Sequence, residues 1–305
     1  MALNQSPLTP RIIFRRLHLA LWLSLPFTAS ALFAQPFLTS GSLTATWHDN
    51  LTQAVAGVEH LAATQFAASL AAEHCHTLNR DDALLLGAAI NAEAWSRYTG
   101  LDRATLGGQL GWRHRFGLGA YAPTLRLDLA TAVVVARESA RTGNQSTATL
   151  RASRRFSPET RLDLAADYGR QTARDTVLGQ QRGSLSAEVA YDPNPQWRWR
   201  GRVRWANGDV LVYHPVTWTP WGWQHLHGYG AGYNYYAFPT SIVRTFGPPH
   251  HAHRVFAHTW SYSLGVSPAI GPRTALTFQI ERAETAYDAI SYINHALTLG
   301  VAHQF

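Results

Sequence analysis

The chain of 305 residues contains one cysteine, Cys75, and no lysine. A single cysteine cannot form an intramolecular disulfide, so the fold cannot depend on such a bond. After the first 34 residues, no apolar run reaches the roughly 20 residues that a transmembrane helix needs. These absences exclude a small disulfide-stapled module, and they exclude a mature protein that crosses a membrane with helices.

The N-terminal segment has the layout of a secretory signal peptide. Three arginines within residues 11–16 precede an apolar run over 17–33, and Ala34 offers a small residue for cleavage. A retained membrane anchor is the alternative, but a proline interrupts a run that is already short for a spanning helix. We therefore predict that residues 1–34 are a signal peptide and that residues 35–305 form the mature protein.

The mature chain carries only a small positive excess. Removal of residues 1–34 takes away three arginines and no acidic residue, so the formal net charge falls from +7 to +4. An excess of this size gives no reason to expect binding to nucleic acid.

Apolar and polar residues alternate with a period of two through the mature chain, which is typical of β-strands that face two different environments. The pattern is clearest in residues 104–113, 124–136, 162–168, 184–191 and 197–205. The same alternation, less regular, is found in residues 41–49, 64–78, 83–97, 146–156, 253–266, 273–283 and 291–305. Together these segments predict about twelve strands, and an even number is what single-chain bacterial barrels have.

Residues 197–205 decide between two kinds of sheet. They place four arginines on one face and three tryptophans on the other. In a soluble protein the aromatic face would form the core and the arginines would be solvated. In a membrane barrel the aromatic face would meet lipid and the arginines would line the lumen. Charged residues are scarce on the apolar faces of all the segments, which favours contact with hydrocarbon.

The connections between the predicted strands sort by length. Short connections rich in turn-forming residues fall at 79–82, 117–122, 157–160, 192–196 and 267–272, after each even-numbered strand. Longer connections fall at 50–62, 137–145, 169–180 and 284–290, with one very long segment at about 207–252. Outer-membrane barrels combine short periplasmic turns with longer outward loops, so this sorting supports a barrel. The aromatic residues at the short-turn end are those of an interfacial girdle: Phe116, Phe156, Tyr191, Trp197 and Phe305.

The last predicted strand carries Leu297, Leu299, Val301, His303 and Phe305 at alternate positions. This resembles the C-terminal strand signature of bacterial outer-membrane β-barrel proteins, from which it departs at His303. The resemblance implies recognition by the barrel assembly machinery through the strand that ends in Phe305. We therefore predict an all-β, transmembrane, antiparallel up-and-down barrel of about twelve strands, monomeric and surrounded by outer-membrane lipid.

The faces opposite the apolar ones would enclose a lumen. Candidate binding residues there are Arg126, Arg151, Arg198, Arg200, Arg202, Arg204, Asp163, Asp167 and Glu188. These side chains could pair with one another and fill the barrel. Alternatively, arginines in excess could line a water-filled pore that favours anions. A barrel of this size lies between those filled by side chains and those with open channels, so both hypotheses stay open.

The long segment over residues 209–253 is dense in aromatic residues and histidines. Its candidate binding residues are Trp218, Trp221, Trp223, Tyr229 and Tyr235. Such rings could stack on a saccharide or present a surface to a partner, or they could simply hold a packed lid together. The histidines of this segment have no acidic or cysteine partner at a recognised metal-binding spacing, so we expect neither a metal nor another cofactor.

Three functions follow from a barrel of this kind. The leading hypothesis is an outer-membrane channel or transport pore for small, anionic solutes. A surface-binding or export-associated barrel that works through residues 209–253 is the second. A lipid-modifying enzyme is the third, but no catalytic motif is recognisable, and His295 falls in the lipid-facing register rather than the lumenal one.

Overall fold

The computed structural model describes residues 37–53, 60–219, 222–225, 240–247, 249–288 and 290–305. The predicted signal peptide lies outside these ranges and remains a prediction. The barrel strands are β1 (Leu38–His48), β2 (Ala63–Thr77), β3 (Asp82–Trp95), β4 (Arg103–Arg115), β5 (Thr124–Ala136), β6 (Gly143–Arg155), β7 (Thr160–Gln171), β8 (Gln180–Asn194), β9 (Trp197–Thr219), β12 (His250–Gly271), β13 (Thr274–Tyr287) and β14 (Ile290–Gln304). Two short strands, β10 (Gly222–His225) and β11 (Thr240–Val243), are paired to β9 and β12.

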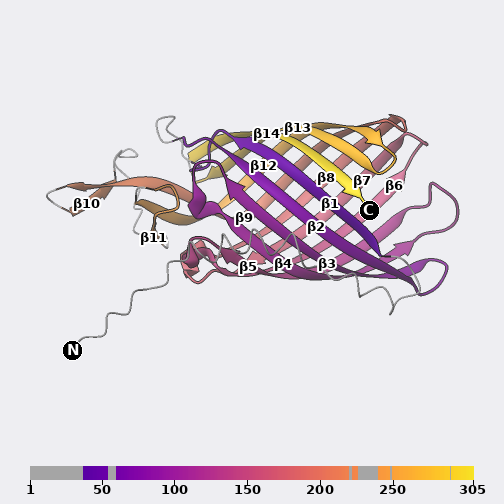
Figure 1. Cartoon of the computed structure of the whole chain (residues 1–305), viewed down its shortest axis with the longest axis horizontal. Helices are drawn as coiled ribbons and strands as arrows, with labels where there is room; N and C mark the ends of the chain where they lie inside the picture. Colours follow the sequence, from indigo (N-terminus) through magenta and orange to yellow (C-terminus); the bar gives the residue numbers. More distant parts are fainter. Residues whose placement is uncertain (1–36, 54–59, 220–221, 226–239, 248, 289) are drawn as a thin grey trace. The chain divides into compact units, whose positions relative to one another are not determined.

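The twelve barrel strands form a closed antiparallel ring. Each strand pairs with the next one along the chain, β9 pairs with β12, and β1 pairs with β14. Figure 1 shows the tilted strands of this ring, with β10 and β11 projecting beyond one end while β14 runs toward the other. Closure leaves no unpaired sheet edge, as a strand structure in lipid requires. The predicted fold class is confirmed.

The cross-strand register divides the side chains into an outer and an inner set. The outer set is apolar and exposed, as Leu106 at 61 %, Leu185 at 55 % and Ile280 at 57 % illustrate. In water this much exposed apolar surface would drive aggregation, whereas lipid solvates it. The inner set is mainly polar or small, with apolar exceptions such as Leu85, Val134 and a group at one end of the ring.

The two ends of the ring differ in their connections. The turns β2–β3, β4–β5, β6–β7, β8–β9 and β12–β13 contain two to eight residues, and the predicted aromatic girdle is exposed at this short-turn end. At the opposite, long-loop end four outward connections are shorter than predicted, those of β5–β6, β7–β8, β9–β12 and β13–β14, whereas β1–β2 keeps about its predicted length. Strands β13 and β14 are joined by residues 288–289 alone, because both strands continue past the expected loop boundary.

Strands β9 and β12 depart most from the prediction. Residues 207–252 were expected to form a loop, but β9 extends to Thr219 and β12 begins at His250, and the two stay in register up to the pair Pro215 and His250. The extension carries Val210, Leu211, Val212 and Tyr213, which are buried on both faces of the strand pair. Apolar residues on both faces erase the alternation that marks a strand in the rest of the sequence.

Among the described residues, short helices occur only in connections at the long-loop end of the barrel. They are η3 (Thr99–Leu101), η4 (Ser139–Arg141) and η5 (Thr176–Leu178). None of the helices among the described residues is long and apolar enough to cross a membrane.

Candidate functional site: the lumen and its cap

The nine predicted lumen residues all lie on the inner face of the barrel. Register pairs such as Arg202 with Glu188, and Glu188 with Asp163, place them on one face, opposite to exposed Leu185 and Val203. The structure therefore brings these side chains together around one interior, although what they bind remains a proposal.

One ion-pair network spans three strand spacings of the wall. Arg126 of β5 binds Asp128 on its own strand and Glu73 of β2, each through an N–O distance of 2.7 Å. On β4, which lies between the two strands, a Cβ added to Gly111 would lie 2.5 Å from an Asp128 carboxylate oxygen, so the glycine leaves room for this carboxylate as it is placed.

A second set of polar contacts lines strands β6 to β9. Arg202 pairs with Glu188, and Arg198 lies 2.7 Å from the Asp192 carboxylate. Asp167 accepts hydrogen bonds from the hydroxyls of Thr149 and Ser184 at 2.8 and 3.2 Å. These contacts correspond to the ion-pair hypothesis, but they account for only part of the arginines.

Several lumenal arginines have no carboxylate at ion-pair distance among the described residues. Arg151, Arg200 and Arg204 belong to this group, as does Arg182 at the long-loop end of β8. They gather on strands β6, β8 and β9, so one side of the lumen carries a positive surplus. Such a wall attracts anions and repels cations.

The wall that adjoins the arginine strands, from β12 round to β1, is lined mainly by small neutral side chains. Strands β12, β13, β14 and β1 contribute the inward residues Ser261, Ser263, Thr277, Gln279, Thr298 and Thr44, together with the acidic Glu281. Side chains of this size reach only a short way into the barrel, which leaves room in front of the arginine wall. Their hydroxyls can hydrogen-bond to water or to a polar solute.

An apolar cluster covers the long-loop end of the ring. It consists of Leu178, Leu211, Tyr213, Val243, Phe246 and Ala252, and we name it the cap. Side chains from the β1–β2, β3–β4 and β5–β6 connections pack against it, including Leu51, Tyr98 and Ala140. Because these connections start from points around the ring, a cluster that they all touch must lie over the opening.

Polar contacts fix the cap to the loops. Arg141 of η4 donates to the Tyr213 hydroxyl at 2.6 Å and pairs with Glu138 at 3.2 Å, and Glu138 also accepts from the Thr245 hydroxyl. Burial opposes the charge of Arg141, but Tyr213 and Glu138 outweigh burial and raise the pKa of the guanidinium. The backbone N–H of Tyr213 donates to the Thr52 carbonyl at 2.9 Å, so the β1–β2 connection is joined as well.

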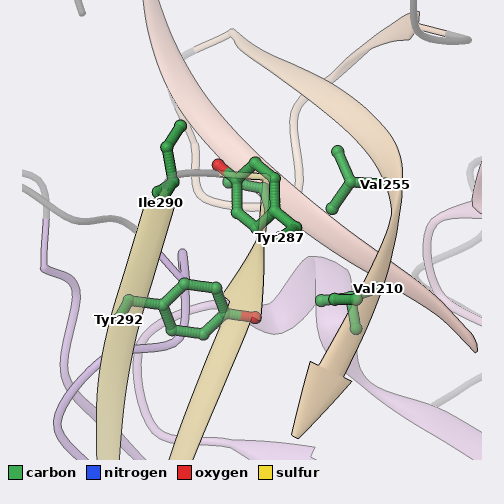
Figure 2. Close-up of a cluster of buried hydrophobic side chains, with 7 residues drawn as sticks. Val210, Val255, Tyr287, Ile290 and Tyr292 are labelled. Atoms are coloured by element: carbon green, nitrogen blue, oxygen red, sulfur yellow. The ribbon is translucent and has the colours of Figure 1, made fainter. Parts of the chain in front are cut away.

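A second apolar cluster lies on the inner face beneath the cap. Figure 2 shows Val210 and Val255 on one side, Ile290 and Tyr292 on the other, and Tyr287 between them. These residues come from β9, β12, β13 and β14, with Ile290 at the first position of β14. We call this group the inner cluster. Together with the cap it forms a two-layered apolar barrier at the long-loop end.

The structure describes only part of the aromatic segment 209–253. Trp218 and Trp223 are paired across the antiparallel strands β9 and β10, and Trp221, Tyr229 and Tyr235 lie outside the described residues. Their predicted binding role is therefore untested. Among the described residues, no group of three or more potential metal-ligating histidine, cysteine or acidic side chains comes together.

The outer wall carries two features without a counterpart in the lumen. An apolar hollow of about 720 Å³ lies over β5 to β9, lined by residues such as Leu150, Leu164 and Leu185, which face the lipid. His295 also faces outward, as predicted, with its Nδ1 atom 2.8 Å from an Asp49 carboxylate oxygen. No serine among the described residues hydrogen-bonds to its ring, so this pair lacks the nucleophile of a hydrolase triad.

Sequence reasoning missed several inward ionisable residues. Glu73, Arg103, Arg161 and Arg182 all belong to the inner set, and Arg103 pairs with Glu93 at 2.8 Å. For Arg161 and Arg182 the signal was present, because they have the same alternation phase as Asp163 and Glu188, which were assigned to the lumen. The predicted strand boundaries were too short to include three of them.

Comparisons with known proteins agree on the fold. No protein-family model and no curated protein matches the sequence. Among solved structures the chain is similar to an outer membrane channel from Pseudomonas putida F1, with 11% identity and a TM-score of 0.55, over 92% of this chain and 100% of that one. It is also similar to the NanC porin (8% identity, TM-score 0.43, 87% of this chain and 100% of that one). A third is outer membrane phospholipase A from Escherichia coli (10% identity, TM-score 0.44, 87% and 92%). At these identities, only the fold is established: an outer-membrane type of β-barrel.

Proposed function

We propose that this protein is an outer-membrane channel for small anionic solutes, closed in its resting state by the cap. The observation that carries the proposal is the surplus of inward arginines, such as Arg151, Arg200 and Arg204, beside a wall of small neutral side chains that begins at β12. A barrel interior filled for stability alone would pair its charges, because an unpaired buried charge is costly. Arginines left facing an open lumen are instead suited to attract anions.

The proposal includes the location and surroundings of the barrel. The predicted signal peptide would direct the chain across the inner membrane, and the strand ending in Phe305 would engage the barrel assembly machinery. The exposed apolar belt would then be solvated by outer-membrane lipid, with the short-turn end in the periplasm. A closed ring without an unpaired edge is compatible with a monomer.

Charge reversal in the arginine row tests the selectivity. The test uses a variant in which the cap has been opened by substitution. In this background, Arg200→Glu combined with Arg204→Glu is expected to change the preference from anions to cations. The ratio of anion to cation permeability should fall by about tenfold or more. Planar-bilayer reversal potentials in a salt gradient measure this ratio. Arg170→Glu is the matched control, because Arg170 is exposed on the outer face of β7. An unchanged ratio in the double variant, or an equal change in the control, would contradict the proposal.

Cys75 offers an independent test of the lumen. It faces inward on β2, with the Arg113 guanidinium 3.7 Å from its sulfur. A negatively charged thiosulfonate reagent is expected to modify Cys75 about tenfold faster than a positively charged reagent of the same size, because the lumen concentrates anions. Mass spectrometry of the single labelled thiol measures the two rates. Equal rates, or no labelling in the folded barrel, would count against an aqueous, positive interior.

A further inference from the structure

Arg182 is the lumenal arginine with the least compensation. It lies at the long-loop end of β8, in register with Gly208 of β9, and its side chain points to the inside. Its Nε atom is buried and has no hydrogen-bond partner among the described residues. No carboxylate of the described residues lies at ion-pair distance from it. The guanidinium is thus partly withdrawn from water, at its Nε atom, without gaining a counter-charge among the described residues, which is energetically costly.

The groups around Arg182 do not supply the missing negative charge. Its electrostatic neighbours are Arg204, which has the same sign, and the Tyr292 phenol. The nearest acidic residue on the inner face is Asp167, which sits opposite Ser184 and is hydrogen-bonded to two hydroxyls. Asp209, next to Gly208, has the outward phase, and its carboxylate accepts from the Gln181 backbone N–H at 3.0 Å. A positive charge with a like-charged neighbour and no acid is the electrostatic condition for binding an anion.

A row of buried hydroxyls starts at Ser184, the next inward residue of β8 after Arg182, and continues through the register to Thr259 and Thr285. Ser184 is 5 % exposed, and the hydroxyls of Thr259 and Thr285 are hydrogen-bonded to each other at 2.9 Å in a buried position. Tyr292 of the inner cluster is paired with Thr285 in the same row, and Figure 2 shows its ring extending toward Val210. Ser184 donates its proton to Asp167, so the Thr259 and Thr285 pair is the part of this row that can donate to an anion.

The backbone of β9 provides the space for this arrangement. Gly208 has a φ of 142°, and a Cβ added there would lie 2.7 Å from the Arg182 Cα atom and 2.4 Å from the Gln181 carbonyl oxygen. Any other residue would collide with the backbone of β8. Glycine therefore lets β8 and β9 approach closely at the level of Arg182.

We infer that Arg182, with the Thr259 and Thr285 hydroxyls, forms a binding site for a small anion at the long-loop end of the lumen. The chemical class is a compact oxyanion, a carboxylate or an inorganic phosphate, which can accept several hydrogen bonds from one guanidinium. The inference rests on the proposed channel function and deepens it, because it names the site at which a solute binds beneath the closed cap.

Anion-dependent thermal stability tests the site without any measurement of conductance. The purified barrel in detergent is heated at constant ionic strength with increasing acetate or inorganic phosphate, and unfolding is followed by heat-modified gel mobility. A ligand that binds the folded state alone raises the midpoint with its concentration, by roughly 5 °C at a hundredfold excess over Kd. Arg182→Gln is expected to lose this dependence. Arg170→Gln, which removes an exposed outward arginine, is expected to keep it.

Two further measurements keep the inference falsifiable if Arg182→Gln folds poorly. Arg182→Lys retains the charge but not the forked donor geometry, so it should bind the same anions about tenfold more weakly. A wild-type midpoint that does not saturate with either anion, or a saturating response that survives in both Arg182 variants, overturns the site. If anion selectivity of conductance persists in that case, the channel function stands without this site. If binding persists but selectivity is absent, the channel function fails and the site remains.

Discussion

Replacing Tyr213 and Phe246 together with alanine is expected to convert a silent barrel into a conducting one. Both rings are buried in the cap at 5 % exposure, and they pack edge to face with centroids 5.0 Å apart. Phe246 also contacts Tyr98 of the β3–β4 connection at 5.2 Å, and Tyr213 holds Arg141. The two rings thus connect the strand extension to the loops on other sides of the opening.

The expected effect is large because each ring belongs to a packed cluster. Truncation of a buried aromatic residue costs about 3–5 kcal/mol. If this energy holds the cap down, each substitution shifts the closed-to-open equilibrium by roughly a hundredfold or more, since 1.4 kcal/mol corresponds to about a factor of ten. Single-channel recording in planar bilayers measures the open fraction of wild type and variant.

A matched control separates opening from general damage. Tyr262→Ala removes a tyrosine that is 46 % exposed on the outer wall of β12, remote from the cap. It should leave the open fraction unchanged. A double variant that folds, as judged by heat-modified mobility, yet stays silent would show that the cap is not the barrier. A wild-type barrel that already conducts continuously would show the same.

The second large effect is a difference in stability between two variants. One places an arginine on the lipid-facing side of β13, and the other places an arginine on its lumenal side. Phe278 faces outward on β13 and is 43 % exposed, whereas its neighbour Gln279 faces the lumen. Phe278→Arg is expected to destabilise the barrel by about 2–4 kcal/mol, because a charge on the lipid face near mid-height cannot be hydrated. Gln279→Arg adds the same charge to the lumen and should change stability by less than about 0.5 kcal/mol.

Reversible urea unfolding in lipid vesicles measures both variants. The comparison is sharp because the two positions are adjacent, so strand propensity and sequence context are nearly the same. Equal destabilisation would mean that the two faces of β13 have similar surroundings. A larger loss for Gln279→Arg would reverse the assignment of inside and outside on which the lumen depends.

The strand pattern could be predicted closely wherever one face is apolar and the other polar. The predicted segment 124–136 coincides with β5, and the lumenal phase of Arg198 to Arg204 on β9 is confirmed by the cross-strand register. In a barrel the two faces of every strand meet different solvents. The sequence must therefore alternate, and alternation is visible without knowing which strands are neighbours.

The closure of the long-loop end could not be predicted in this way. The extension of β9 is buried on both faces, by the inner cluster on one side and the cap on the other, so Leu211 and Tyr213 show no alternation. The partners of these residues lie in connections far apart in sequence. No local sequence pattern predicts such contacts. The connections come together over one opening only when the ring has closed.

The amino-acid sequence alone was thus sufficient to predict the class of fold, the number of barrel strands and the charged character of the interior. These three properties follow from a period-two pattern that each strand displays by itself. Which arginines are neutralised was decided by the folded barrel. Arg126 reaches Glu73 across three strand spacings, while Arg182 has no carboxylate at ion-pair distance in the part of the chain that the structure describes. Pairing depends on side-chain reach across neighbouring strands, and that distance exists only after the sheet has closed.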